Sequence, residues 1–431
     1  MVEKALAAEK VRFNDGIYTP LVTLCTFLSQ VLDPDHSCRG AVARVVVWLA
    51  IRGRRPCSSE TGSDCDARRR LPVGVVRRLV RQTAEEIDRE AADGWLWRGR
   101  RGMLVDGTTV SMPDTAKNQD VFPQSTTQGI GLGFPPARIV VIIAWATGVV
   151  HDMAIGPYQG KETRETALFR TLWDSLKPGD IMLGDRFFCT FFGIAGLRQR
   201  SVDVLFRMHR RRKYDFRRGH CLGVEDHVAT WTKPARPEWM DETTYDRMAE
   251  TIEVRELRVK VGQAGFRVES LVLTTTLLDA TIYPKEAVAD LYLKRRHIEV
   301  DLRSIKYVLQ MDVLRCKSPE MAEKEIWVHL LAYNLIRGVT AQAAKAHGKP
   351  PRELSFKGAL QTMAAFEDPL READPIERKR LMEAMLKAIA SHRVGNRFGR
   401  TEPRADNRRP KPQKYLTTPR AEARKQLLKQ A

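Results

Sequence analysis

The hydrophobic pattern changes its period near residue 95, and this change constrains the fold more than any other feature. Before it, apolar residues recur with a helical period; after it, short apolar runs are bounded by Gly, Pro and polar turns. The later segments are strands at 103–110, 138–146 and 149–156, a helix at 163–176, a strand at 180–185, a helix at 189–200 and a strand at 202–207. This order predicts an α/β fold with a mixed sheet flanked by helices.

The pattern also divides the chain into five regions. We expect a helical N-terminal domain at 1–94, a core in two parts at 95–206 and 286–345, a β-rich insertion at 207–285 between them, and a helical region with a basic tail at 346–431. Within the insertion, 251–261 and 267–278 are predicted to form a hairpin. The tail from residue 393 has several prolines and few apolar residues, so we expect disorder there until a partner binds.

The charge balance indicates the kind of partner. Lys and Arg number 72 and Asp and Glu 53, which leaves a formal net charge of +19. This excess favours a polyanion, because neutralising phosphates releases counterions, so nucleic acid is expected first and an anionic membrane second. The longest apolar run, 139–150, is too short and too interrupted to cross a bilayer, and the N-terminus lacks a signal-peptide apolar segment. We therefore expect a cytosolic protein.

Two clusters in the N-terminal region have alternative interpretations. An arginine strip is typical of a helical DNA-binding module, or of a helical bundle with a solvated basic face; it comprises Arg68, Arg69, Arg70, Arg77, Arg78 and Arg81. The group His36, Cys38, Cys57 and Cys65 has no standard zinc-site spacing, and the seven cysteines form no Cys-x-x-Cys pair. Reduced thiols are therefore favoured over a zinc site.

A helix predicted at 286–309 carries the most informative polar stripe. At about 100° per residue, four side chains fall within an arc of roughly 60° beside an aliphatic face. They are Tyr292, Arg295, Glu299 and Lys306. Asp301 points nearly the opposite way and is expected to be a bystander. The alternative is an ordinary solvated face with ion pairs one turn apart.

Two further carboxylates end predicted strands. Asp106 lies in the first strand and Asp185 ends the fourth, where a carboxylate needs a partner. If these strands are neighbours, the two acids lie close together and Glu299 reaches them from a helix packed across the sheet edge. Three converging carboxylates predict a hard-cation site, because like charges repel without one. Asp203 is the strongest competing acid.

These motifs resemble those of a DDE transposase of the insertion-sequence-4 family. The matching segments are LVDGTT at 104–109, LGDRFF at 183–188, and a Tyr-x2-Arg-x3-Glu-x6-Lys signature filled by Tyr292, Arg295, Glu299 and Lys306. The resemblance implies an RNase H-like core with a β-rich insertion before the last acid. It also implies that Asp106, Asp185 and Glu299 are the catalytic residues and hold two Mg²⁺ ions, which Mn²⁺ could replace.

The resemblance further implies a reaction and its partners. Water would nick the ends of a mobile element, and the freed 3′-OH would then join to target DNA in a cut-and-paste reaction. The partners would be double-stranded DNA, namely the terminal inverted repeats and the target, together with a second copy in a synaptic homodimer. No membrane would be involved, and the enzyme would reside in a bacterial cytoplasm, on the nucleoid when DNA is bound. Tyr292, Arg295 and Lys306 would hold phosphates beside the scissile bond.

The insertion adds candidate DNA contacts. Arg210, Arg211 and Arg212 form a basic run with aromatic residues interleaved after it. Relatives hold a flipped base on an aromatic residue of the insertion, and Trp231 and Trp239 are the candidates here, with loop packing as the alternative.

Two other functions share parts of this pattern. An RNase H-like nuclease without strand transfer would need the three acids but not the phosphate-holding residues. A catalytically inactive DNA-binding derivative of a transposase is disfavoured by the intact acids.

Overall fold

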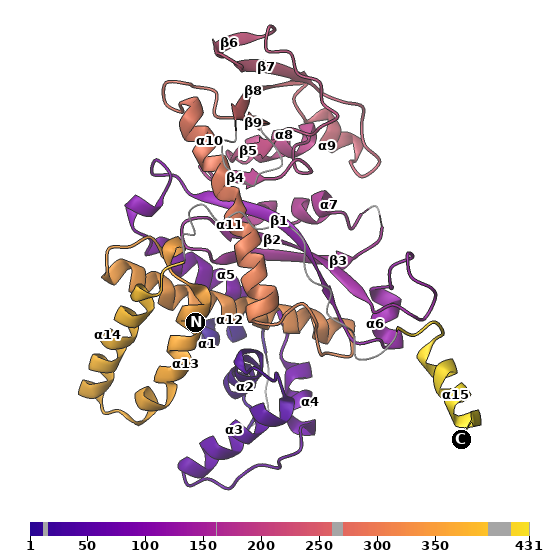
Figure 1. Cartoon of the computed structure of the whole chain (residues 1–431), viewed down its shortest axis with the longest axis vertical. Helices are drawn as coiled ribbons and strands as arrows, with labels where there is room; N and C mark the ends of the chain where they lie inside the picture. The colour runs from indigo at the N-terminus through magenta and orange to yellow at the C-terminus, as the bar shows by residue number, and fades with distance from the viewer. Residues whose placement is uncertain (12–15, 161, 261–269, 395–414, 431) are drawn as a thin grey trace.

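A single mixed sheet organises the molecule. The computed structural model describes residues 1–11, 16–160, 162–260, 270–394 and 415–430. Within them, nine strands form one sheet in the order β3-β2-β1-β4-β5-β9-β8-β7-β6 (Figure 1). The strands are β1 Gly102–Ser111, β2 Pro136–Ala144, β3 Val150–Pro157, β4 Ile181–Gly184, β5 Asp203–Arg207, β6 His220–Gly223, β7 Asp226–Thr232, β8 Thr251–Lys260 and β9 Ser270–Thr275.

The pairing of the first five strands is mixed, as the order of the sequence segments predicted. β1 runs antiparallel to β2 and parallel to β4, and β2 is antiparallel to β3. The expectation that the first and fourth strands are neighbours is confirmed. The helix predicted at 163–176 is shorter than expected: it consists of α7 (Glu165–Arg170) and a separate 3₁₀ turn at Trp173–Ser175.

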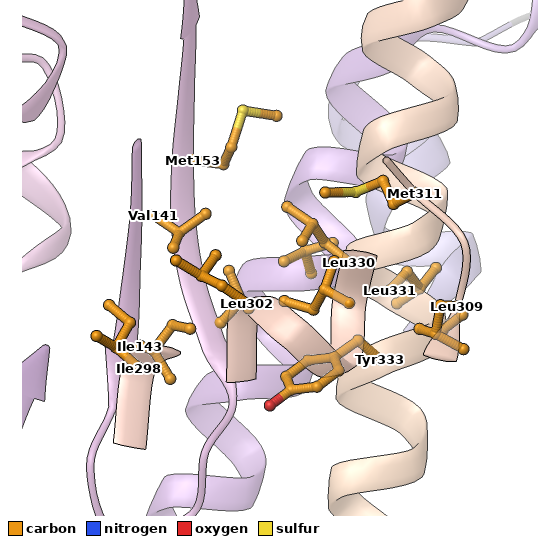
Figure 2. Close-up of a cluster of buried hydrophobic side chains, with 14 of the residues drawn as sticks. Val141, Ile143, Met153, Ile298, Leu302, Leu309, Met311, Leu330, Leu331 and Tyr333 are labelled. Atoms are coloured by element: carbon orange, nitrogen blue, oxygen red, sulfur yellow. The ribbon is translucent and has the colours of Figure 1, made fainter. Parts of the chain in front are cut away.

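Helices cover both faces of the sheet. Side chains alternate along β1, so Leu104 packs on one face and Met103 and Val105 on the other. The Leu104 face is covered by α5 (Val73–Arg89), α11 (His297–Arg303) and α12 (Pro319–Ala346), and the other face by α7 and α8 (Phe191–Gln199). Figure 2 shows Ile298 and Leu302 of α11 lying against Val141 and Ile143 of β2, so α11 is fastened to the sheet through its apolar side.

The predicted insertion continues the same sheet. β8 and β9 pair as an antiparallel hairpin, which confirms that expectation, although the connection at 261–269 lies outside the described residues. β9 also pairs with β5 of the core. The strands β6 to β9 therefore extend the sheet, with α9 (Glu242–Asp246) and the adjoining loops beside them in Figure 1.

The N-terminal region is helical, with α1 (Val2–Ala8), α2 (Pro20–Leu32), α3 (Cys38–Ile51), α4 (Gly62–Arg70) and α5. α2 begins at a clear capping signal: the Thr19 hydroxyl accepts a hydrogen bond from the Val22 amide and Pro20 occupies the first turn. α4 forms in a stretch rich in charged residues, with Asp64 in its first turn and three arginines in its last. α5 packs on β3 and on α12, so the last N-terminal helix is part of the core.

The predicted arginine strip is largely neutralised. Arg68 is buried and donates to Asp64 and Gln30. Four of the remaining five arginines pair with carboxylates: Arg69 with Asp66, Arg77 with Glu323, Arg78 with Glu9 and Arg81 with Asp152. The strip appeared uniformly basic in the sequence because these acids lie on other turns or distant elements; Arg68 is buried, and the four paired arginines remain partly exposed.

The C-terminal region continues with α13 (Phe356–Glu372), α14 (Pro375–Ser391) and α15 (Arg420–Gln430). Residues 395–414 of the predicted disordered tail lie outside the described residues. The prediction is wrong for the last part of the tail, where Pro419 precedes a run of strong helix formers. None of the helices in the described segments is long and apolar enough to cross a membrane.

Candidate active site

Two aspartates lie just beyond the point where the parallel pairing of β1 and β4 ends: Asp106 inside β1, and Asp185 one residue past the end of β4. Leu104 of β1 is in register with Leu183 of β4. Two residues further along each strand are Asp106 and Asp185, which therefore share the sheet face that α11 covers. Asp106 accepts a hydrogen bond from the Gly107 amide at 2.8 Å, and Asp185 accepts one from the Phe187 amide at 2.8 Å. Both carboxylates are thereby oriented by their own backbone.

Arg295 connects these strands to the third acid. Its Nη1 lies 3.3 Å from Asp106 Oδ2 and its Nη2 lies 2.7 Å from Glu299 Oε1. The guanidinium thus supplies positive charge between two carboxylates from elements almost 200 residues apart. Arg295 thus brings Asp106 and Glu299 together, and the charge of Asp185 acts on both Asp106 and Arg295.

The site disfavours a bare negative charge on Asp106. Burial raises the pKa of Asp106, Arg295 opposes the rise, and the nearby carboxylates Asp185 and Glu299 add to it. Tyr292 is buried beneath the same cluster, and burial raises its pKa to about 12. The phenol is therefore a neutral donor at physiological pH.

The helix that carries the polar stripe is not uniform. It runs as α10 (Lys285–Leu293), a 3₁₀ turn at Lys294–Arg296, α11 and a π-helical turn at Ser304–Val308. The expectation of one regular α-helix over 286–309 is wrong, and a constant 100° per residue does not apply across these changes. Lys306 lies in the π-helical turn, with its ammonium 5.8 Å from the ring centroid of Tyr307.

Asp301 is not a bystander. It is completely buried and accepts hydrogen bonds from Tyr333, Arg337 and Arg352. Burial alone would raise its pKa, but the two guanidinium groups hold that pKa below its usual value. The helical angle placed Asp301 correctly away from Glu299, whereas its buried partners come from 32 or more residues later in the chain and were not visible in the local pattern.

The residues of the site fit a hard divalent cation in donor type. Carboxylate oxygens are the ligands such ions prefer, and Asp185 and Glu299 add to the rise in the pKa of Asp106 that burial mainly causes. In the described part of the chain no three His, Cys, Asp or Glu side chains are gathered closely enough to hold a metal ion. Arg295 instead occupies the cationic position between Asp106 and Glu299.

The sequence analysis missed one acid, Glu165 at the start of α7. Its carboxyl carbon and Oε1 come within 2.5 Å of the point where a Cβ on Gly107 would lie. Burial raises the pKa of Glu165, and Asp106 and Asp185 raise it further. No motif distinguishes Glu165 from its charged neighbours, and the significance of Gly107 emerges only once α7 is placed over β1.

A basic hollow of about 1010 Å³ adjoins these acids. Its cationic lining consists of Arg138, Arg164, Arg211, Arg212 and Lys213, and Glu165 and the half-exposed Phe187 also line it. Arg211 and Arg212 were predicted as DNA contacts, and Arg210 is exposed beside them. The hollow therefore extends from Glu165, beside the carboxylate site, to Arg211, Arg212 and Lys213 of the insertion.

The two candidate tryptophans differ in exposure. Trp231 is buried, its indole N–H donates to Glu256 at 2.8 Å, and the guanidinium carbon of Arg212 lies 3.5 Å from its ring centroid. It has no open face for a base, because it is part of β7 and packs in the hydrophobic core; the packing alternative holds for it, in a strand and not in a loop. Trp239 is 38% exposed and carries Arg170 at 3.6 Å from its ring centroid. The competing acid Asp203 pairs with Arg100 at 2.5 Å and has a structural role.

Comparison with known proteins gives several matches. The transposase DDE domain family matches residues 97–335. The chain is 28% identical over 384 residues to the transposase InsG for insertion sequence element IS4 of Escherichia coli (strain K12), across 86% of this chain and 81% of that protein. A stretch of 65 residues, 15% of this chain and 18% of the relative, is 43% identical to the transposase for insertion sequence element IS421 of Escherichia coli. Among solved structures, a piggyBac transposase synaptic complex with hairpin DNA covers 93% of this chain and 83% of that chain, with a TM-score of 0.42 and 11% identity.

Proposed function

The chain belongs to the DDE transposases of the insertion-sequence-4 family, and from this premise we propose that it moves an insertion sequence by metal-dependent nicking and strand transfer. The matched range 97–335 contains Asp106, Asp185 and Glu299. In the proposed reaction, water attacks the phosphodiester at each element end and the released 3′-OH attacks target DNA. The atoms balance at each step, because one P–O bond forms as another breaks.

An RNase H-like core is part of this proposal. Its support is the order β3-β2-β1-β4-β5, in which β2 alone runs antiparallel to both its neighbours and the later strands are joined through helices. This topology makes β1 and β4 neighbours, so that Asp106 in the middle of β1 lies beside Asp185 just after β4. We accordingly propose the domain division of the sequence analysis, with β6 to β9 as an insertion fused to the sheet edge.

We assign the metal-holding role to Asp106, Asp185 and Glu299. Membership of the DDE family implies a divalent metal, and we propose two Mg²⁺ ions, replaceable by Mn²⁺. When bound, such ions activate the attacking oxygen and stabilise the leaving oxygen. Arg295, now between Asp106 and Glu299, is free to turn its planar fork to a DNA phosphate once its carboxylates are neutralised. We propose that the Tyr292 hydroxyl donates a hydrogen bond to the same phosphate and that Lys306 adds a point charge.

The basic hollow is the proposed path of double-stranded DNA from the carboxylates to the insertion. Its five cationic side chains suit a phosphate backbone, and Phe187 and Trp239 offer partly exposed rings beside it. Because two element ends must be cut and joined together, we propose a synaptic homodimer on the terminal inverted repeats, in a bacterial cytoplasm.

The observation that carries the proposal is the ion pairing of Arg295 with both Asp106 and Glu299, with the charge of Asp185 nearby. The decisive experiment measures Mg²⁺-dependent nicking of element-end duplexes by the wild type and by Asp106→Asn, Asp185→Asn and Glu299→Gln. Each variant should retain DNA binding and lose nicking, while a matched control, Asp174→Asn at a 92% exposed side chain, should nick normally. Retained nicking in all three variants would contradict the proposal, and nicking without joining to target DNA would indicate a nuclease.

The DNA path has its own test. Arg211→Gln in the hollow should weaken binding regardless of sequence and reduce the salt dependence by about one counterion. The control is Arg371→Gln on α13, another solvent-exposed arginine that pairs only with acids of its own helix in the described contacts. Equal salt slopes for both variants would remove the hollow from the DNA path.

A further inference from the structure

Among the residues that the structure describes, the carboxylate with the most hydrogen bonds lies two residues after Glu299. Asp301 receives the Tyr333 hydroxyl at 2.9 Å, Arg337 Nη2 at 2.7 Å, and Arg352 Nη1 at 2.6 and 2.7 Å from its two oxygens. Arg337 Nε also donates to the Tyr333 hydroxyl at 2.9 Å, which closes the network. Buried charges persist only with such complete pairing.

The donors come from separate elements. Tyr333 and Arg337 lie one turn apart on α12, and Arg352 belongs to the 3₁₀ turn Pro351–Glu353. Arg352 also donates to the backbone carbonyls of Ala144 at 3.0 Å and Trp145 at 2.5 Å, where β2 ends. The network therefore ties α11 to α12 and to the central sheet at the same time.

α11 needs an external restraint on its rotation. It has only seven residues and lies between a 3₁₀ turn and a π-helical turn, so long regular helices do not set its direction from either side. Its apolar residues Ile298 and Leu302 hold it against β2, but apolar contacts tolerate small rotations better than directed hydrogen bonds do. A rotation of this turn would move Glu299 away from Arg295 and Asp106.

We propose that Asp301 is a positioning residue of the active site, which fixes the rotation of α11 so that Glu299 and Arg295 reach Asp106. The inference deepens the proposed function and rests on it for the role of Glu299. Asp301 does not touch the reacting atoms; it acts through the orientation of its helix, as the groups behind metal ligands generally do.

The chain offers a matched control for simple stabilisation. Asp226 accepts two hydrogen bonds from Arg255 at 2.7 and 2.5 Å, and both residues are buried. This pair joins β7 to β8, at the other end of the sheet from β1. Asp301→Asn and Asp226→Asn thus remove the same charge from similar surroundings, but only the first lies on the helix of Glu299.

The test uses the full-length chain at a temperature where circular dichroism shows each variant to be folded. Two quantities are measured: the Mg²⁺ concentration for half-maximal nicking, and Mn²⁺ binding without DNA by electron paramagnetic resonance of the free ion, with Glu299→Gln as background. We expect Asp301→Asn to weaken both by about tenfold or more, and Asp226→Asn to match the wild type. If Asp301→Asn does not fold, Arg352→Lys should give a smaller shift in the same direction, because an ammonium lacks the fork that reaches Asp301 and the strand end together.

The outcomes separate the two proposals. The positioning role would be overturned if the Asp301 and Asp226 variants behaved equally in both measurements. It would also be overturned if Arg352→Lys gave wild-type values. If the wild type does not nick DNA, the proposed function is overturned. Positioning would still be supported in that case if Asp301→Asn bound Mn²⁺ more weakly than the wild type and Asp226→Asn did not.

Discussion

Two arginine–carboxylate clusters on one short helix have nearly the same chemistry and different surroundings. In the first, Arg295 joins Asp106 and Glu299, whose side chains are 18%, 22% and 63% exposed. In the second, Asp301 is 0% exposed, and its partners Arg337 and Arg352 are 4% and 9% exposed. The clusters are held by elements on opposite sides of α11.

This difference in solvent access separates an exchangeable ion pair from a structural one. An ion pair in contact with water contributes little to stability, because water replaces either partner at small cost. When a buried pair loses one partner, the remaining charge is stranded in a medium that solvates it poorly. Arg295 is therefore able to leave its carboxylates for a cation or a phosphate, whereas Arg337 and Arg352 stay with Asp301.

The largest expected effect tests the exchangeable cluster. Glu299→Gln should reduce Mg²⁺-dependent nicking by about a thousandfold or more, because a neutral isostere removes a metal ligand. Stability and DNA affinity should remain close to wild type, since Glu299 is largely exposed. Single-turnover nicking and urea unfolding measure the two quantities, and a large loss of stability would show that Glu299 is structural.

The second effect is on stability. Arg337→Met should lower the free energy of unfolding by about 3 kcal/mol or more, because it leaves Asp301 buried with one guanidinium fewer. Arg371→Met, at an exposed helical pair, is the control and should change the free energy by less than about 1 kcal/mol. Similar losses in both variants would abolish the distinction between the two clusters.

The stability of Arg295→Gln with and without metal distinguishes the two clusters further. Without metal, the variant should lose less than about 1 kcal/mol, as partly exposed pairs do. Added Mg²⁺ should raise its thermal midpoint more than that of the wild type, because nothing then competes with the cation for Asp106 and Glu299. In Arg337→Met, added Mg²⁺ should raise the thermal midpoint no more than it does in the wild type. An equal Mg²⁺ response in both variants would count against metal binding at this cluster.

Acidity should act on the two clusters in opposite directions. The pKa of Asp106 is raised by burial, so its ionisation costs stability as pH rises through that value; Asp106→Asn should be more stable than wild type at neutral pH, with the gain shrinking on acidification. The pKa of Asp301 is lowered, so its contribution is present above the ordinary carboxyl pKa and lost only as pH falls through the folded value. Urea unfolding measured from neutral to acidic pH tests the direction of both changes in stability. A gain for Asp106→Asn that grows on acidification would contradict the first.

The smallest effect concerns Glu165. Burial raises the pKa of Glu165, and the nearby charges of Asp106 and Asp185 raise it further. Glu165→Gln should therefore change nicking by less than about tenfold and leave stability nearly unchanged, since it removes a neighbouring charge and not a primary ligand. Glu162→Gln, three residues earlier and 71% exposed, is the control and should behave as wild type. A thousandfold loss in Glu165→Gln would place it among the primary ligands.

Much of the fold was predictable because its signals are local. The runs at 103–110 and 180–185 bury every apolar residue in β1 and β4, and Thr19 and Pro20 mark the start of α2. Asp106 and Asp185 were identifiable because a carboxylate at the end of an apolar strand needs a partner. The tail was less predictable, since its composition resembles that of a disordered segment although its last residues favour a helix.

The sequence by itself determined the order of strands and helices, the two aspartates and the glutamate, and the family to which they belong, because periodicity and short motifs act over a few residues. The tertiary structure alone decided which charges face water. Asp301 and Arg68 appear solvent-accessible in a local pattern, yet both are buried against partners from other elements. Glu165 became part of the site only when α7 crossed Gly107. Electrostatic energy depends on distance and desolvation, and both are set by the packing of segments far apart in the chain.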